Sequence, residues 1–71
     1  MNKTNEGDLV YIPSGTTLFV LDIQNMPKKI MKLDRPANLL VTNVQNDRYE
    51  VLYMNESWLV KKNNTYEVKN D

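Results

Sequence analysis

The side chains best suited to binding a partner are concentrated in one stretch, MPKKIMKLDRP, residues 26–36. Four cations lie there against a single carboxylate, Asp34: Lys28, Lys29, Lys32 and Arg35. A local excess of cations favours contact with an anionic partner, either a phosphate backbone or an acidic protein surface. The stretch is therefore the first candidate for a binding site.

Apolar residues alternate with these cations. Met26, Ile30 and Met31 would form the centre of a protein contact with lysines around it, because methionine adapts to irregular surfaces. The alternative is a solvated loop whose Ile30, Met31 and Leu33 pack onto the rest of the domain. The sequence leaves both interpretations open.

Two further groups could add to this site. Lys61 and Lys62 could extend the basic surface, or they could simply protect a strand from edge-to-edge pairing. Aromatic side chains could stack on bases or belong to the core; these are Trp58, Tyr49, Tyr53 and Tyr66. The candidate binding residues are thus Lys28, Lys29, Met31, Lys32, Arg35, Lys61, Lys62 and Trp58.

The sequence contains few residues in arrangements suited to catalysis. The chain has no cysteine and no histidine, so thiolate or imidazole metal ligands and the usual general base are missing. Its two serines, Ser14 and Ser57, have no histidine to activate them, and the two glycines cannot form a phosphate loop. The sequence predicts a protein that is not an enzyme, with no metal and no cofactor.

Length and charge restrict the class of protein. The 71 residues allow one domain, and the 9 basic and 9 acidic side chains cancel, unlike the excess of cations typical of nucleic-acid binders. No apolar run is long enough to span a bilayer, and the polar start does not resemble a signal peptide. We expect a cytoplasmic protein, in the host cytoplasm if it is phage-encoded, with a flexible lead-in at 1–7, a domain at 8–68 and a tail at 69–71.

The pattern of short apolar runs between turn residues predicts an all-β fold. Strands are expected at 8–12, 16–23, 38–45, 48–54, 57–62 and 66–68, with a 3₁₀ turn at 63–65. Residues 24–37 read as an irregular loop or a splayed hairpin arm. Tight two-residue turns are expected at Asn46-Asp47 and Asn55-Glu56.

These turns fix a predicted register and two faces. Tyr53 would oppose Trp58, and Glu50 would oppose Lys61. One face would form the core: Leu40, Thr42, Val44, Tyr49, Val51, Tyr53, Trp58 and Val60. The other would carry a second apolar group, formed by Leu39, Val41, Leu52, Met54 and Leu59.

The order of elements resembles the SH3-like small barrel. The residues that carry the resemblance are a first strand, GDLVYIP, a long first loop of two arms and a tip at 14–37, three strands in a meander, and the closing segment ESWLVKKNNTYEV. The resemblance implies a barrel of about five strands. The chain lacks the ALYDY motif, the paired tryptophans and the acidic first loop of the peptide-binding members. Its composition also resembles small accessory proteins of tailed phages.

Three functions remain open. The favoured one is a protein-binding module, a phage accessory protein that docks an unidentified host or phage protein through the 26–35 loop. The second is nucleic-acid or nucleotide binding through the basic loop and an exposed aromatic side chain. The third is a self-assembling structural subunit that buries the apolar group around Leu39, Val41 and Met54 between copies.

Overall fold

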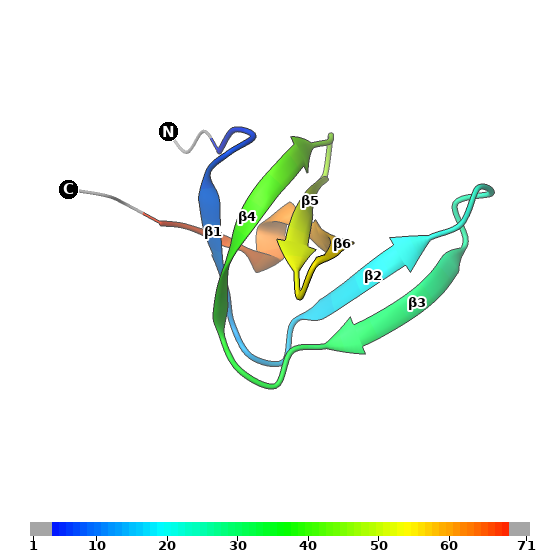
Figure 1. The fold of residues 1–71 in the computed structure, drawn as a ribbon, viewed down its shortest axis with the longest axis horizontal. Helices are drawn as coiled ribbons and strands as arrows, with labels where there is room; N and C mark the ends of the chain where they lie inside the picture. Colours follow the sequence, from blue (N-terminus) through cyan, green and yellow to red (C-terminus); the bar gives the residue numbers. More distant parts are fainter. Residues whose placement is uncertain (1–3, 69–71) are drawn as a thin grey trace.

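The computed structural model of the protein describes residues 4–68 and contains seven strands and one 3₁₀ turn (Figure 1). In chain order these are β1 (Leu9–Ile12), β2 (Thr17–Leu21), β3 (Pro27–Lys32), β4 (Ala37–Val44), β5 (Arg48–Tyr53), β6 (Glu56–Lys61), η1 (Lys62–Asn64) and β7 (Tyr66–Glu67). The strands form one antiparallel sheet in the order β3-β2-β6-β5-β4-β1-β7. The predicted all-β class is confirmed.

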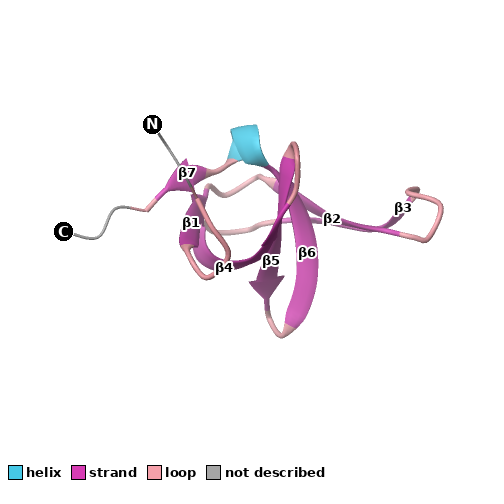
Figure 2. Ribbon diagram, turned by 90° about the horizontal axis from the view of Figure 1, so that it is seen from above, coloured by secondary structure: helices cyan, strands magenta, loops and turns pink. Residues whose placement is uncertain are grey.

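The strand expected at 16–23 is present as β2, and it pairs with β3, so the splayed hairpin arm is the alternative for 24–37 that the structure has. With β3, seven strands form where the resemblance implied about five. No helix among the described residues is both long and apolar enough to cross a membrane. Seen from above, β1, β4, β5 and β6 surround the interior, and the β2–β3 hairpin projects to one side (Figure 2).

The core is a single cluster of apolar side chains inside the curved sheet. Nine of them are buried: Val10, Ile12, Leu18, Leu33, Leu39, Val41, Val51, Trp58 and Val60. In β1, β4 and β6 these residues alternate with exposed or half-buried ones, as the two-residue period of a strand requires. Each fully buried aliphatic side chain contributes about 1.5–3 kcal/mol, so a domain this small depends on all of them.

A β-bulge in β4 decides which face of that strand points inward. The Asn46-Asp47 turn is as predicted, since the Gln45 amide donates to the Arg48 carbonyl oxygen over 2.9 Å. Past the Asn43↔Glu50 pair, Thr42 is an extra residue in the ladder. The prediction for β4 is therefore wrong: Leu39 and Val41 lie in the core, while Leu40 is exposed. Leu39 and Val41 are not available for a contact between copies.

The β5–β6 turn lies one residue earlier than predicted. Met54 and Asn55 both have positive φ, 52° and 66°, as the central pair of a type I′ turn requires. Tyr53 consequently pairs with Glu56, and Trp58 pairs with Val51. The predicted Tyr53–Trp58 and Glu50–Lys61 pairs are wrong. The shift moves each partner by two residues, however, so every side chain keeps its predicted face.

The predicted ends of the domain are only partly described. Residues 1–3 of the lead-in and the tail 69–71 lie outside the described residues. Within the lead-in, the Asn5 amide donates to the Asp8 carboxylate over 2.9 Å. The Gly7 amide donates to the Val41 carbonyl oxygen over 2.8 Å. The turn before β1 is thus hydrogen-bonded to the sheet.

The turn at Met54 gives a test of the register. Side chains other than Asn, Asp and Gly are strained at positive φ, so Met54→Asn should stabilise the protein by about 0.5–1 kcal/mol. Chemical denaturation would measure the change. Glu56→Asn is the matched control and should give no gain, because Glu56 is a strand residue. A gain for Glu56→Asn and none for Met54→Asn would favour the turn predicted at 55–56.

Candidate protein-contact surface

The β2–β3 hairpin with its flanking residues, 16–33, is called the arm below. Its base is fixed to the domain by two backbone hydrogen bonds: the Gly15 amide donates to Leu33 over 2.8 Å, and the Leu33 amide donates to Thr16 over 3.0 Å. Gly15 has a φ of 84°, a conformation that glycine adopts without strain. Leu18 and Leu33 are buried beneath the base, so the arm is anchored at one end and free at the other.

The free end is ordered by the carboxylate of Asp22. Its Oδ1 accepts hydrogen bonds from the Gln24 and Met26 amides, each over 2.9 Å. The Asp22 amide in turn donates to the Met26 carbonyl oxygen over 2.8 Å, and Asn25 adopts a φ of 63°. A short polar side chain that bonds its own turn in this way holds the loop in one conformation. The tip is therefore preorganised rather than a random loop.

The arm exposes three large apolar side chains, two at its tip and one on β3. Ile23 is 99% exposed, Ile30 67% and Met26 58%. Scattered single apolar residues are normal on a protein surface, but three on one projecting hairpin form a group that water solvates poorly. Of the residues expected to pack onto the domain, Leu33 is buried and Met31 half-buried, whereas Ile30 is not.

Strand alternation separates the lysines of the arm onto two faces. Lys29 pairs with Val20 and faces the domain, where its Nζ lies 5.1 Å from the centre of the Trp58 ring. The same Nζ lies 3.1 Å from Glu56 Oε2. Both side chains of this ion pair are about half exposed, so solvent screens it and its contribution to stability is small. Lys29 is thus engaged within the chain.

Lys32 lies on the opposite, outer face of the arm. It pairs with Thr17, and the Phe19↔Leu59 pair brings Thr17 beside Lys61 on β6. Thr17 and Lys61 accordingly line one shallow hollow. Lys61 in turn pairs with Arg48 on β5. The outer face therefore carries a basic row of Lys32, Lys61 and Arg48.

An apolar row lies next to the basic one. Ile30 pairs with Phe19, and Phe19 pairs with Leu59, so the three side chains share the outer face across β3, β2 and β6. Phe19 and Leu59 are half-buried and Ile30 is exposed. Together with Ile23 and Met26 at the tip, this row gives the arm an apolar surface with cations on one side.

The remaining predicted binding residues lie apart from these rows. Lys28 is exposed on β3 at the irregularity between Val20 and Leu21, and Arg35 is exposed between β3 and β4. Lys62 begins η1, with its Nζ 5.3 Å from the centre of the Tyr49 ring. Trp58 belongs to the core at 6% exposure, so it offers no ring face to a ligand.

Sequence reasoning missed several residues of this surface, among them Ile23 and Arg48. Ile23 was placed at the end of a strand because it continues an apolar run, and the signal that was overlooked is Asp22 followed by Asn25, which is typical of a turn. Arg48 was recognised only as a strand residue. Its place opposite Lys61 depends on the turn at Met54 and Asn55.

The surroundings of Trp58 give a second test. Because the ring is buried, acrylamide should quench its fluorescence far less than that of free tryptophan. Lys29→Ala should raise the quenching and destabilise the protein by less than about 1 kcal/mol, since the cation–π contact is partly solvated. Lys28→Ala is the matched control and should change neither. Quenching of the unmodified protein as strong as that of free tryptophan would contradict the register of β6.

Among residues 4–68, no three His, Cys, Asp or Glu side chains lie close enough together to hold a metal ion. Comparison with known proteins found no matching family model, no matching curated protein and no matching solved structure. The proposals below therefore rest on the residues and geometry of this chain alone.

Proposed function

We propose that the protein is a non-enzymatic protein-binding module that contacts its partner through the arm. The observation that carries this proposal is the exposure of Ile23, Met26 and Ile30 on a hairpin whose tip is held by Asp22. Exposed apolar side chains on an ordered element lose little conformational entropy on binding. They are the kind of anchor that fills a pocket on another protein.

The charges around these anchors suggest the chemistry of the partner. Lys28 and Lys32 are exposed on β3, and Lys32 forms the basic row of the outer face with Lys61 and Arg48. Such cations would select a partner whose apolar pocket has an acidic rim, and they would speed the encounter. We expect this partner to be a protein of a phage or of its host.

The SH3-like architecture is part of this proposal. It is supported by the position of the arm directly after the first strand, by the β4–β5–β6 meander, and by η1 before a two-residue last strand. In the sheet order, β4 lies between β5 and β1, so one long strand connects the meander to the β1–β7 pair. The β4 bulge lies where this strand passes from one group to the other.

Nucleic-acid binding is the second candidate, and the basic row of Lys32, Lys61 and Arg48 favours it. Phe19 lies beside this row, so it, rather than Trp58, would supply the stacking ring. In this case affinity for an oligonucleotide would fall steeply with salt, because each neutralised phosphate releases counterions. Since Phe19 is half-buried, we favour the protein partner.

The arm variants Ile23→Asp and Lys28→Glu/Lys32→Glu test the proposal. Each should weaken capture of the protein partner from a native lysate by more than about tenfold, because a charge replaces an apolar anchor or reverses the attraction. Quantitative mass spectrometry of the captured proteins would measure the loss. The same proteins should also be titrated with single-stranded oligonucleotides at low and high salt.

Met54→Asp is the matched control for Ile23→Asp. Met54 is also exposed, at 79%, and also lies in a hairpin turn, but that turn joins β5 to β6 and is not part of the arm. Its variant should capture the same partner as the unmodified protein. Capture that survives all arm variants would refute the proposed function, and salt-sensitive oligonucleotide binding would replace it with the second candidate.

A further inference from the structure

Strand β3 forms one edge of the sheet. Among the described residues the strand order places it beside β2 alone, and the arm projects to one side of the domain (Figure 2). Five of its six residues are exposed, and Met31 is half-buried. An edge strand presents a row of unpaired amide and carbonyl groups, which can hydrogen-bond to another extended chain. The arm therefore offers a backbone edge in addition to its apolar side chains.

The register of the arm identifies the residues whose backbone groups are free. The Leu33 amide donates to the Thr16 carbonyl oxygen over 3.0 Å. Along an antiparallel ladder, hydrogen-bonded pairs alternate with pairs that are not hydrogen-bonded. Ile30 and Lys32 lie three residues and one residue before Leu33, so both belong to pairs that are not hydrogen-bonded to β2. Their amide and carbonyl groups consequently point to the free side of β3.

This edge is basic, because three of the six residues of β3 are lysines: Lys28, Lys29 and Lys32. Within residues 4–68, Lys29 is the one of the three that forms an ion pair, with Glu56. Pairing with the β3 of another copy would bring three lysines from each copy onto adjacent strands, and like charges across a ladder are destabilising. The same lysines attract a strand that carries carboxylates. The charges thus favour an acidic strand over a second β3.

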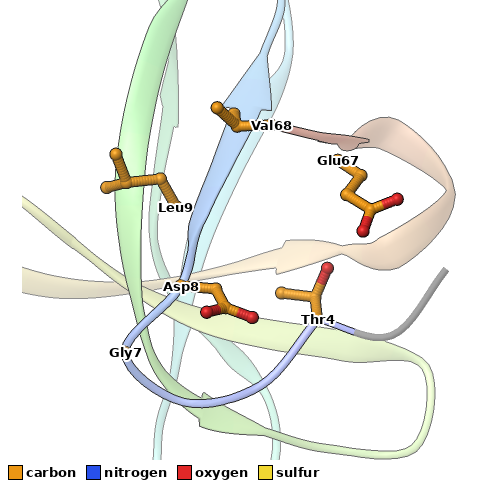
Figure 3. Close-up of a pocket in the computed structure, with 6 residues that line it drawn as sticks. All are labelled: Thr4, Gly7, Asp8, Leu9, Glu67 and Val68. Atoms are coloured by element: carbon orange, nitrogen blue, oxygen red, sulfur yellow. The ribbon is translucent and has the colours of Figure 1, made fainter. Parts of the chain in front are cut away.

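The other edge of the sheet does not suit an acidic strand. Strand β7 has two residues, Tyr66 and Glu67, which offer few backbone groups to a ladder. Asp8 and Glu67 line a hollow beside this strand together with Thr4 (Figure 3). Their carboxylates would repel other carboxylates. In the described sheet, β3 is therefore the edge that fits an acidic partner.

We propose that the partner of the arm binds as an extended acidic segment, which lies antiparallel to β3 and adds an eighth strand to the seven of the sheet. The inference rests on the proposed function, since it states how the partner of the arm is held. Backbone groups of the segment exchange hydrogen bonds with Ile30 and with Lys32, whose own groups are free. Antiparallel pairing continues the arrangement that β3 already has with β2.

Cross-strand pairing also specifies the side chains of the segment. Ile30 shares the outer face with Phe19, so an apolar residue is favoured opposite Ile30. Lys32 lies on the same face, two residues further along β3, and favours a carboxylate opposite it. Because the two strands run in opposite directions, the carboxylate precedes the apolar residue by two positions. The expected motif is therefore an acidic residue, any residue and an apolar residue.

A synthetic peptide tests the added strand. In this peptide glutamate and valine alternate at every second position, and threonine fills the positions between them. At saturation it should slow hydrogen exchange of the Ile30 and Lys32 amides by more than about tenfold, because both become hydrogen-bonded. The Met31 amide, which already faces β2, is the internal control and should change less. A peptide with lysine in place of glutamate should bind more than about tenfold more weakly.

Two substitutions at one position separate the backbone from the side chain. Ile30→Ala keeps the free amide, whereas Ile30→Pro removes it, and proline is tolerated on an edge strand where the amide faces solvent. Ile30→Pro should bind the acidic peptide more than about tenfold more weakly than Ile30→Ala does. If circular dichroism shows that Ile30→Pro does not fold, exchange of the Ile30 and Lys32 amides in the unmodified protein decides.

Three results would overturn the inference. They are no binding of the acidic peptide, binding that leaves the Ile30 and Lys32 amides unprotected, and equal binding of the acidic and basic peptides. Equal binding by folded Ile30→Pro and Ile30→Ala would also contradict it. If Ile23→Asp still abolished capture of a protein partner in these cases, the proposed function would stand and the added strand alone would be refuted.

Discussion

The small apolar core is the constraint on which the rest of the structure depends. A chain of 71 residues without cysteine forms no disulfide, so it depends mainly on this core and on its backbone hydrogen bonds. Nine side chains form it, and the sheet must curve to bring them into one cluster. Every strand then has a second face that the core cannot use. Apolar residues on that second face, such as Ile30 and Leu40, therefore remain exposed.

The sequence predicted the strands well because alternation and turn residues are local signals. The Asn46-Asp47 turn is as predicted, and its register holds as far as the bulge at Thr42. The errors arose where tertiary packing, and not the local sequence, determines the conformation of the backbone. The bulge at Thr42 has no local signal, yet it reverses the face of Leu39 to Val41. Met54 is an unusual residue at positive φ, so the neighbouring Asn55 and Glu56 were preferred as the turn.

The candidate site was only partly predictable for the same reason. A cluster of lysines in sequence becomes two separate groups in a strand, because neighbouring side chains point to opposite faces. Lys29 consequently contacts Trp58 and Glu56 within the chain, while Lys32 joins Lys61 from a distant strand. The sequence showed where charge is concentrated, and the strand pairing determined on which face each charge lies.

Amide hydrogen exchange in dilute solution tests most directly whether the arm lies apart from the core. Exchange rates follow the free energy of local opening, which is smallest where few apolar contacts hold the backbone. We expect slow exchange in β5, around Val51, and much faster exchange in the tip and in β3, around Ile30. Equal protection of β3 and β5 would mean that the arm is packed into the domain, and that its apolar side chains are not free to bind a partner.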